Sequence, residues 1–424
     1  MKPKIVHIIN SFEFGGAEVM LGNLLARTGR GRFEPVVVSL IDDLRLADGI
    51  LASGIPVRVV GMRPGVLDPL AVARLACLLR RERPRVIQTW MDHSNFIGGI
   101  AMRLALRAVL VWGVHHSQHV RGVTKRTTLM TVSACARLSR RLPARIVCCS
   151  EQARSEYARR GFAAEKLVVI PNGFDTAAFR PDPAARARVR GELGLGPEAT
   201  LIGLVARYDP VKDHPNFLRA AALLRGRVPG VHFLLCGDKV DRGNAALTSA
   251  VESLGLRDRC HLLGPRRDIA RIQASLDLAT SSSVSEAFPL CLGEAMACGV
   301  PCVATDVGDS AAILGETGRV VPPRAPAALA DAWEELLGLD PDARARLGLA
   351  ARRRIRRRYD LASVAERYED LYEHLLAGEP GSGGPPIDHR DPVSERATSR
   401  RPLAPRSRDL TPWNRSPRSA ENSS

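Results

Sequence analysis

The sequence predicts an α/β protein made of two Rossmann-like domains that face a cleft. Short strand-like apolar runs alternate with helical stretches, a pattern typical of βαβ units and a parallel sheet. This series occurs twice along the chain. Between the two series, residues 176–199 carry several prolines and glycines but no apolar strand, so they are interpreted as a connection between domains.

The first series contains seven expected strands and two clear helices. The strands are expected at Ile5–Ile9, Pro35–Leu40, Pro56–Val60, Val86–Thr89, Val109–Val114, Ile146–Cys148 and Leu167–Ile170. The helices are expected at Ala17–Thr28 and at Pro69–Arg81, where apolar residues recur at helical spacing.

The second series resembles the first. Strands are expected at Leu201–Val205, Val231–Cys236, His261–Leu263, Leu276–Thr280 and Cys302–Ala304. Helices are expected at Phe217–Leu224, at Leu290–Cys298 before the C-capping Gly299, and near 326–337 and 341–357. In Leu361–Leu376, apolar residues form one helical stripe: Leu361, Val364, Ala365, Tyr368, Leu371, Tyr372 and Leu375.

These elements give the following domain assignment. The first domain is 1–178, the linker 179–199, the second domain 200–358, the terminal helix 359–377 and the tail 378–424. The tail is rich in Pro, Ser, Arg and Gly and contains almost no apolar side chains, so we expect it to be disordered.

Composition excludes several classes of protein. We expect neither a secreted nor an integral membrane protein, because no apolar run reaches the roughly 18 residues of a membrane span and the first residues read as a strand rather than as a signal peptide. The nine cysteines form no C-x-x-C pair, so neither a disulfide framework nor a zinc site is expected. We expect reduced, mostly buried thiols in a cytoplasmic protein.

The formal net charge of +16 comes from 55 Arg and 6 Lys against 45 acidic residues. These cations are spread along the chain, which favours a solvated basic surface over a nucleic-acid interface. Attraction to anionic lipid headgroups is a second interpretation.

The strongest motif runs from Ser281 to Pro323. Glu286 lies in a loop after an expected strand, and Glu294 follows eight positions later in a helix. Both carboxylates can accept hydrogen bonds from sugar hydroxyls, and the helix N-terminus between them offers N–H groups to an anion. Ligands of open α/β sheets bind at this carboxyl end of the strands.

This segment resembles the donor-binding signature of the retaining glycosyltransferases of family 4, which have the two-domain GT-B fold. Three further stretches are similar to motifs of that family. They are Gly15-Gly16-Ala17-Glu18, Ile170-Pro171-Asn172-Gly173-Phe174-Asp175, and Val205 to Asp213. The resemblance covers roughly residues 4–376.

The resemblance implies a site for a nucleotide-diphosphate sugar. Arg207 and Lys212 clamp the diphosphate, and the Gly16 loop approaches it. Glu294 holds the ribose, and Glu286 holds the transferred sugar. The segment Phe288, Pro289 and Leu290 supplies backbone contacts.

The resemblance also implies groups on the side of the acceptor. A histidine after the strand 109–114 approaches the transferred sugar. His116 matches that position best, and His115 is the alternative. His93 and Asn95 end the preceding strand and are expected to touch the acceptor, but Trp90 stands where the family often has histidine.

Three other residues depart from the family pattern. Ala287 and Asp309 stand where glycines are usual, and Leu290 stands where many relatives have a polar residue. No metal or other cofactor is expected. The one D-x-D, Asp340-Pro341-Asp342, is interpreted as a helix N-terminus, with Asp as N-cap and Pro as first helical residue.

The stretch 120–145 has seven basic residues and no acidic one, with apolar residues between them. Two interpretations stay open: a helix on an anionic membrane surface, or a helix that covers the sheet with its arginines outward.

These observations favour an enzyme that transfers a sugar to a glycan or lipid-linked acceptor, with retention and without a metal. The expected setting is cell-surface polysaccharide or glycolipid assembly, in the cytoplasm or peripherally on the inner face of the membrane. Two alternatives remain. One is a sugar-nucleotide epimerase or phosphorylase on the same architecture, and the other is a non-catalytic basic protein that binds membrane or nucleic acid.

Overall fold

The fold is known from a computed structural model, which describes residues 2–13, 15–28, 31–63, 68–105, 107–115 and 126–378. The expected disordered tail, apart from Gly378, lies outside the described residues. So does His116.

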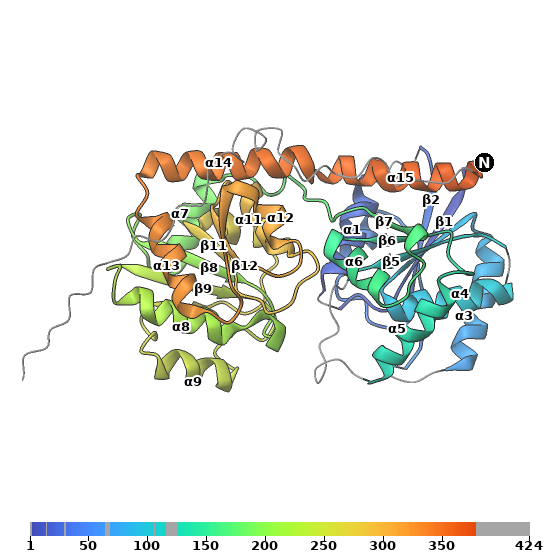
Figure 1. The fold of residues 1–424 in the computed structure, drawn as a ribbon, viewed down its shortest axis with the longest axis horizontal. Helices are drawn as coiled ribbons and strands as arrows, with labels where there is room; N and C mark the ends of the chain where they lie inside the picture. Colours follow the sequence, from blue (N-terminus) through green and yellow to red (C-terminus); the bar gives the residue numbers. More distant parts are fainter. Residues whose placement is uncertain are drawn as a thin grey trace, which may run out of the picture. The chain divides into compact units, whose positions relative to one another are not determined.

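A seven-stranded parallel sheet organises the first domain, with strand order β3-β2-β1-β4-β5-β6-β7. Figure 1 labels its strands β1, β2, β5, β6 and β7. Its strands are β1 (Lys4–Ile9), β2 (Glu34–Ser39), β3 (Val57–Val59), β4 (Val86–Trp90), β5 (Val109–Val114), β6 (Arg145–Cys148) and β7 (Leu167–Val169). The helices are α1 (Gly16–Arg27), α2 (Asp48–Ala52), α3 (Pro69–Glu82), α4 (Asp92–Ala105), α5 (Arg126–Leu138) and α6 (Glu151–Arg159), with the 3-10 turn η1 (Ala164–Lys166).

Apolar clusters lie on both faces of this sheet. One cluster joins alternate strand residues such as Val6 and Ile8 to side chains of α3, α4, α5 and α6. The other joins Ile5 and Ile9 to α1, α2 and α15 (Leu361–Ala377). Burial on both faces explains why the strands are continuous apolar runs rather than alternating ones.

The second domain has a six-stranded parallel sheet with strand order β10-β9-β8-β11-β12-β13. Its strands are β8 (Thr200–Val205), β9 (Val231–Cys236), β10 (Cys260–Leu262), β11 (Leu278–Ser281), β12 (Cys302–Thr305) and β13 (Gly318–Val321). The helices are α8 (His214–Arg225), α9 (Ala245–Ser253), α10 (Ile269–Ser275), α11 (Leu290–Ala297), α12 (Ser310–Leu314) and α13 (Pro326–Leu337), with the turns η2 (Pro210–Lys212) and η3 (Gly315–Thr317).

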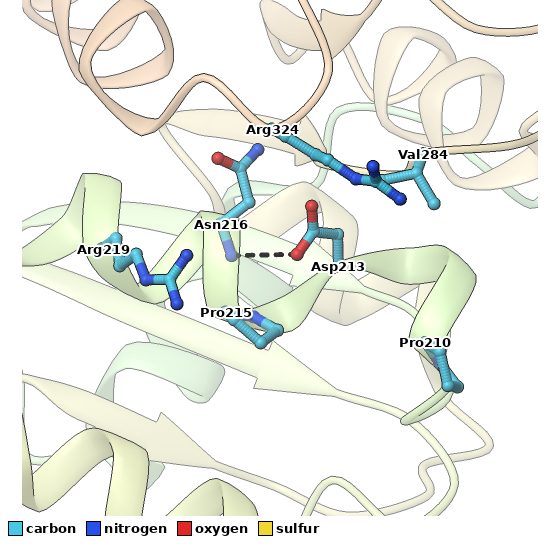
Figure 2. Close-up of a pocket in the computed structure, with 7 residues that line it drawn as sticks. All are labelled: Pro210, Asp213, Pro215, Asn216, Arg219, Val284 and Arg324. Atoms are coloured by element: carbon cyan, nitrogen blue, oxygen red, sulfur yellow. Dashed lines mark hydrogen bonds between the residues drawn. The ribbon is translucent and has the colours of Figure 1, made fainter.

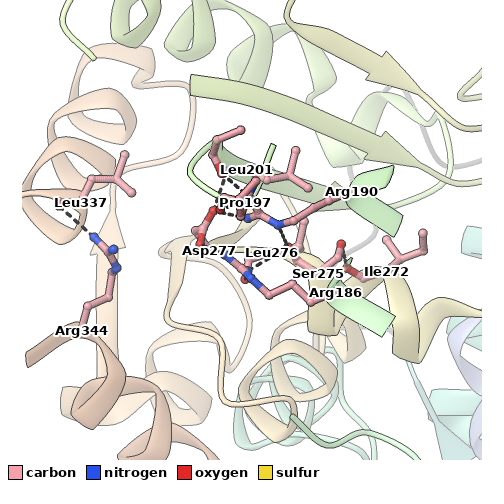
Figure 3. A network of polar contacts seen from close by, with 11 residues as sticks. Arg186, Arg190, Pro197, Leu201, Ile272, Ser275, Leu276, Asp277, Leu337 and Arg344 are labelled. Atoms are coloured by element: carbon pink, nitrogen blue, oxygen red, sulfur yellow. Dashed lines mark hydrogen bonds and ion pairs between the residues drawn. The ribbon is translucent and has the colours of Figure 1, made fainter. Parts of the chain in front are cut away.

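The segment interpreted as a linker contains helix α7 (Pro183–Glu192), which was not expected from the sequence. Asp182 caps α7 through the N–H of Ala185, and Pro183 is its first residue. Arg186 and Arg190 pair with Asp277 at 2.6 Å each, next to β11 (Figure 3). Arg190 is only 3% exposed. Much of the linker is therefore fixed to the second domain.

The chain then forms α14 (Pro341–Arg358) and α15. Helix α14 begins as predicted, because the Asp340 carboxylate accepts from the N–H of Ala343, and it packs against α11. Helix α15 packs on the first sheet beside α1. Six residues of its apolar stripe are buried there: Leu361, Val364, Ala365, Tyr368, Leu371 and Tyr372.

Besides α7, no helix was predicted from the sequence at α2, α4, α6, α9, α10 or α12, and no strand at β13. Strand β13 lies at the edge of the second sheet, and α4 contains the adjacent glycines Gly98 and Gly99. Seven of the nine cysteines are buried, as predicted, while Cys77 is exposed and Cys291 is partly exposed. Within the described residues, no helix has both the length and the apolar character needed to span a bilayer.

Candidate functional site

Lys212 and Glu286, both predicted to contact the donor, form an ion pair. Lys212 Nζ lies 2.5 Å from Glu286 Oε1, and the hydroxyl of Ser283 donates to the same oxygen at 2.7 Å. The lysine follows β8 and the glutamate follows β11, two neighbouring parallel strands. The carboxyl edge of the second sheet therefore brings these charges together, where ligands of such sheets bind.

Burial and charge act in opposite directions on Lys212. Burial lowers the pKa of its ammonium, but the adjacent Glu286 charge and hydrogen bond more than offset this, so the pKa is raised. The lysine therefore stays charged at neutral pH. Its side chain is 22% exposed, and the Glu286 side chain is 11% exposed.

The turn before Lys212 is fixed by local caps. Asp209 accepts from the N–H of Val211 at the start of η2, and its other oxygen lies 3.2 Å from Arg207 Nε. Asp213 then adopts a left-handed backbone (φ +48°) and caps α8 through the N–H of Asn216. Arg207 and Lys212 are thus held on one short turn at the same sheet edge.

Helix α11 begins at this edge after Pro289, the N-cap residue, whose side chain makes no cap bond. The sequence predicts that the first N–H groups of this helix face an anion. Leu290 lies close to Gly16, because a Cβ on Gly16 would come 3.5 Å from Leu290 Cδ1. The predicted glycine loop and the predicted donor segment therefore meet.

Glu294 lies one turn into α11, and burial raises the pKa of its carboxyl to about 7. Gln273 lies beside it and donates to the carbonyl of Cys291 at 3.1 Å. A carboxyl with this pKa changes charge near neutral pH, which is common at functional sites.

Sequence reasoning missed a second carboxyl of this kind, Glu18. It lies in the first turn of α1 and folds back over Gly15, where a Cβ would come 2.2 Å from Glu18 Oε2. Burial raises its pKa to about 7, while Arg207 acts in the opposite direction. The Gly-Gly pair gave a signal for the loop, but no sequence pattern indicates the pKa of the glutamate.

Phe288 packs in an aromatic cluster where the chain crosses between the domains. Phe174 stacks on Phe288 with ring centroids 5.9 Å apart, and Tyr359 contacts both rings. The backbones of Phe174 and Leu361 also pair: Phe174 N donates to Tyr359 O, and Leu361 N donates to Phe174 O. Both segments that connect the domains therefore contact Phe288 of the predicted donor segment.

Gly293 makes this packing possible. A Cβ at this position would lie 2.0 Å from the ring of Phe174, so Gly293→Ala must displace the ring and with it Phe288. We expect a loss of about 1–3 kcal/mol in the free energy of unfolding, typical of overpacking, and a higher KM for the donor. Denaturant unfolding and donor kinetics measure both.

The double variant Gly293→Ala/Phe174→Leu provides the control. A smaller side chain at 174 leaves room for the new methyl group, so stability and donor KM should partly recover. Equal values for wild type and Gly293→Ala would contradict the packing argument.

Of the two adjacent histidines after β5, His115 and His116, the structure describes only His115. Its ring stacks on Trp90, with centroids 4.9 Å apart and planes at 20°, and both ring nitrogens are buried. Trp90 itself is 0% exposed, stacks on Tyr368 and donates to His7. Trp90 therefore belongs to the interior, whereas His115 as a whole is only partly buried, so His116 and His115 both stay candidates for the sugar contact.

The two residues predicted on the acceptor side have different surroundings. His93 is partly exposed and lies 3.5 Å from the hydroxyls of Thr128 and Thr131 on α5. Asn95 is 0% exposed and joins β4 to β5, since it accepts from Thr89 and donates to Gly113 O. The prediction that Asn95 contacts the acceptor does not fit this placement, because α4 begins at Asp92 and turns Asn95 inward.

A pocket of about 310 Å³ lies beside the Lys212 turn (Figure 2). In it, Asp213 already caps α8, so the first N–H groups of that helix face a carboxylate rather than an open anion site. The N-terminus of α8 in this pocket is therefore already capped, unlike the predicted anion position at Lys212 and α11. The residues that line the pocket are Pro210, Asp213, Pro215, Asn216, Arg219, Val284 and Arg324.

Comparison with known proteins agrees with this arrangement. Residues 14–178 match the family described as "Glycosyltransferase Family 4", and residues 199–338 match "Glycosyl transferases group 1". The D-inositol 3-phosphate glycosyltransferase of Nocardia farcinica is 35% identical over 212 residues, which are 48% of this chain and 46% of the relative. The match thus spans less than half the length of that relative.

Two other proteins are similar over more of their length. The putative glycosyltransferase EpsF of Bacillus subtilis is 24% identical over 72% of this chain and 79% of its own. The crystal structure of HepE from Anabaena in complex with UDP-glucose has a TM-score of 0.77 and 25% identity, and the match covers 89% of this chain and 100% of HepE. With both domains matched and the GT-B arrangement of two parallel sheets, the chain belongs to glycosyltransferase family 4.

Proposed function

We propose that this glycosyltransferase moves a sugar from a UDP-sugar to a glycan or lipid-linked acceptor, with retention of configuration and without a metal ion. The observation that carries the proposal is the Lys212–Glu286 pair beside the uncapped N-terminus of α11. HepE, which is similar over its whole length, was crystallised with UDP and with UDP-glucose, which supports the choice of donor. The proposed role is cell-surface polysaccharide or glycolipid assembly.

The proposed roles follow from charge and position. Lys212 and Arg207 neutralise the negative charge that grows on the departing diphosphate. Glu294 accepts hydrogen bonds from the ribose, while Glu286 and His116 contact the transferred sugar. The acceptor oxygen attacks the anomeric carbon from the side of the departing phosphate, and that phosphate takes the acceptor proton. No enzymic nucleophile is required.

The test is transfer of labelled sugar from candidate sugar nucleotides to lipid and glycan fractions. We expect a labelled product with the anomeric configuration of the donor, assigned by NMR, and equal rates with and without EDTA. An isomerised free donor would instead indicate an epimerase. An inverted product would contradict retention, and loss of activity in EDTA would contradict metal independence.

Glu294 predicts a pH dependence. The ionised carboxylate is the stronger hydrogen-bond acceptor, and the pKa is about 7, so affinity for UDP-glucose should rise between pH 6 and pH 8. Glu294→Gln should bind more weakly and lose most of this dependence. Calorimetric titration of both proteins across this range measures it, and equal pH slopes would contradict the ribose assignment.

Glu18→Gln is the matched control for Glu294→Gln, because it removes another carboxyl whose pKa is about 7.

The raised pKa values of Glu18 and Glu294 predict that the free energy of unfolding falls as pH rises from about 4.5 through 7. The reason is that the folded state keeps these two protons to a higher pH than the unfolded state does.

Peripheral membrane binding is proposed for α5, which also covers the sheet through Val132, Cys135 and Ala136. Its outer side presents arginines and Met130, which is 72% exposed. We expect co-sedimentation with vesicles containing anionic lipid, and less with neutral vesicles or at high salt. Equal sedimentation with both kinds of vesicle would contradict an electrostatic contact.

A further inference from the structure

Asp309 binds a helix of the other domain. It occupies the N-cap position of α12, yet its carboxylate makes no cap bond within that helix. Its oxygens instead accept from the backbone N–H groups of Glu151, at 3.1 Å, and Gln152, at 3.2 Å. These two residues begin α6, which follows β6 in the first sheet.

The Asp309 carboxylate completes the cap of α6. The hydroxyl of Ser150, the N-cap residue, accepts from the N–H of Ala153 at 3.0 Å, and this leaves the first two N–H groups of the helix to Asp309. A negative charge at a helix N-terminus is favourable, because the helix dipole is positive there. Asp309 is 7% exposed, so water competes little for these bonds.

The backbone of Asp309 follows the donor segment. Its N–H donates to the carbonyl of Ala287 at 3.1 Å. The preceding Gly308 has φ +59°, and a Cβ there would lie 2.5 Å from Glu286 O and 2.8 Å from Ala287 O. The backbone at 308–309 therefore lies directly against residues 286–287, while the Asp309 side chain holds α6.

We propose that Asp309 is a positioning residue that fixes the donor-binding segment 286–290 relative to α6 of the first domain. The inference rests on the proposed function for the role of that segment. The backbone of Asp309 contacts Ala287, and its side chain contacts α6. When its carboxylate is lost, a smaller fraction of the enzyme should hold the donor segment in its binding position, and apparent donor affinity should fall by that fraction.

Four variants separate this role from general stability. Asp309→Ala removes both bonds to α6, and Asp309→Asn keeps the shape while removing the charge and one acceptor oxygen. Ser150→Ala weakens the same helix cap from within the first domain. Asp306→Asn, an exposed residue of the same loop, controls for a change of loop charge. The readouts are kcat and KM for UDP-glucose, melting temperature, and hydrogen exchange at the start of α6.

We expect Asp309→Ala to raise donor KM about three- to tenfold, with Asp309→Asn intermediate, and both to speed exchange at Glu151 and Gln152. Ser150→Ala should lower the melting temperature without this rise in KM, and Asp306→Asn should match wild type. Unchanged KM or exchange in Asp309→Ala, or an equal rise in KM in Ser150→Ala, would overturn the proposal. Wild-type protein inactive with every sugar nucleotide would instead refute the proposed function, while hydrogen exchange would still test the cap.

Discussion

Replacing Lys212 by alanine should lower kcat by about 10²–10³-fold, corresponding to roughly 2.7–4 kcal/mol of transition-state stabilisation. The ammonium lies at the carboxyl edge of the second sheet, where the diphosphate is proposed to depart. Folding should change much less, since Glu286 keeps its bond from Ser283. Initial rates at saturating donor, together with melting temperatures, measure both effects.

Two variants control this result. Lys212→Arg keeps the positive charge and should retain part of the activity, although guanidinium geometry differs. Arg219→Ala removes an exposed cation from α8 and should leave kcat unchanged. Near wild-type turnover in Lys212→Ala would contradict the phosphate assignment.

Ending the chain after Arg358 should prevent stable folding of the first domain. This cut removes α15, which buries six apolar or aromatic residues against the first sheet. Each large apolar side chain contributes about 1.5–3 kcal/mol on full burial, and a whole domain is stable by only about 5–15 kcal/mol. The cut also removes the acidic partners of Arg32 on α15, which are Glu369, Asp370 and Glu373.

A second truncation, after Gly378, is the matched control. Helix α15 ends at Ala377, with Gly378 as its C-cap at φ +81°. The protein truncated after Gly378 should keep wild-type solubility, melting temperature and turnover. If the two truncated proteins behave alike, α15 is not needed for folding of the first domain and that assignment is wrong. If the longer one loses acceptor transfer, the tail has a function.

The strands could be predicted from the sequence because most are buried on both faces and read as short apolar runs. Edge strand β13 carries a weaker signal, because only Val320 and Val321 of its four residues have apolar side chains. Helix α4 was obscured by Gly98 and Gly99, which indicate a break. In the structure Gly98 lets the helix approach β4, since a Cβ would lie 2.7 Å from the side chain of Thr89. Tertiary contact outweighs local propensity there.

Helix α7 could have been found. Its start, Asp182-Pro183, has the same N-cap and first-turn pattern as Asp340-Pro341, which was interpreted correctly. The buried side of α7 does not read as apolar in the sequence. Arg190 lies on that side and is buried as an ion pair with Asp277.

Residues of the candidate site could be predicted where a motif lies directly after an expected strand, as for Lys212 and Glu286. Contacts between distant segments left no such signal. The bonds of Asp309 to α6 join residues 157 and 158 positions apart. Asn95 was placed at a strand end, but the turn into α4 directs it inward. Residue type and position indicate chemistry, whereas orientation depends on the packed fold.

The central claim is that a nucleoside-diphosphate donor binds at Lys212 and α11. The most direct test is a thermal-shift titration of wild type and Lys212→Ala with UDP, UDP-glucose and the other common sugar nucleotides. At a concentration about 100 times Kd, a ligand stabilises the folded state by about 2.7 kcal/mol. We predict that at least one nucleoside diphosphate and the corresponding nucleotide sugar raise the melting temperature of the wild-type protein by several degrees. Lys212→Ala should lose most of this shift. No shift with any nucleotide, or equal shifts in both proteins, would contradict donor binding at this position.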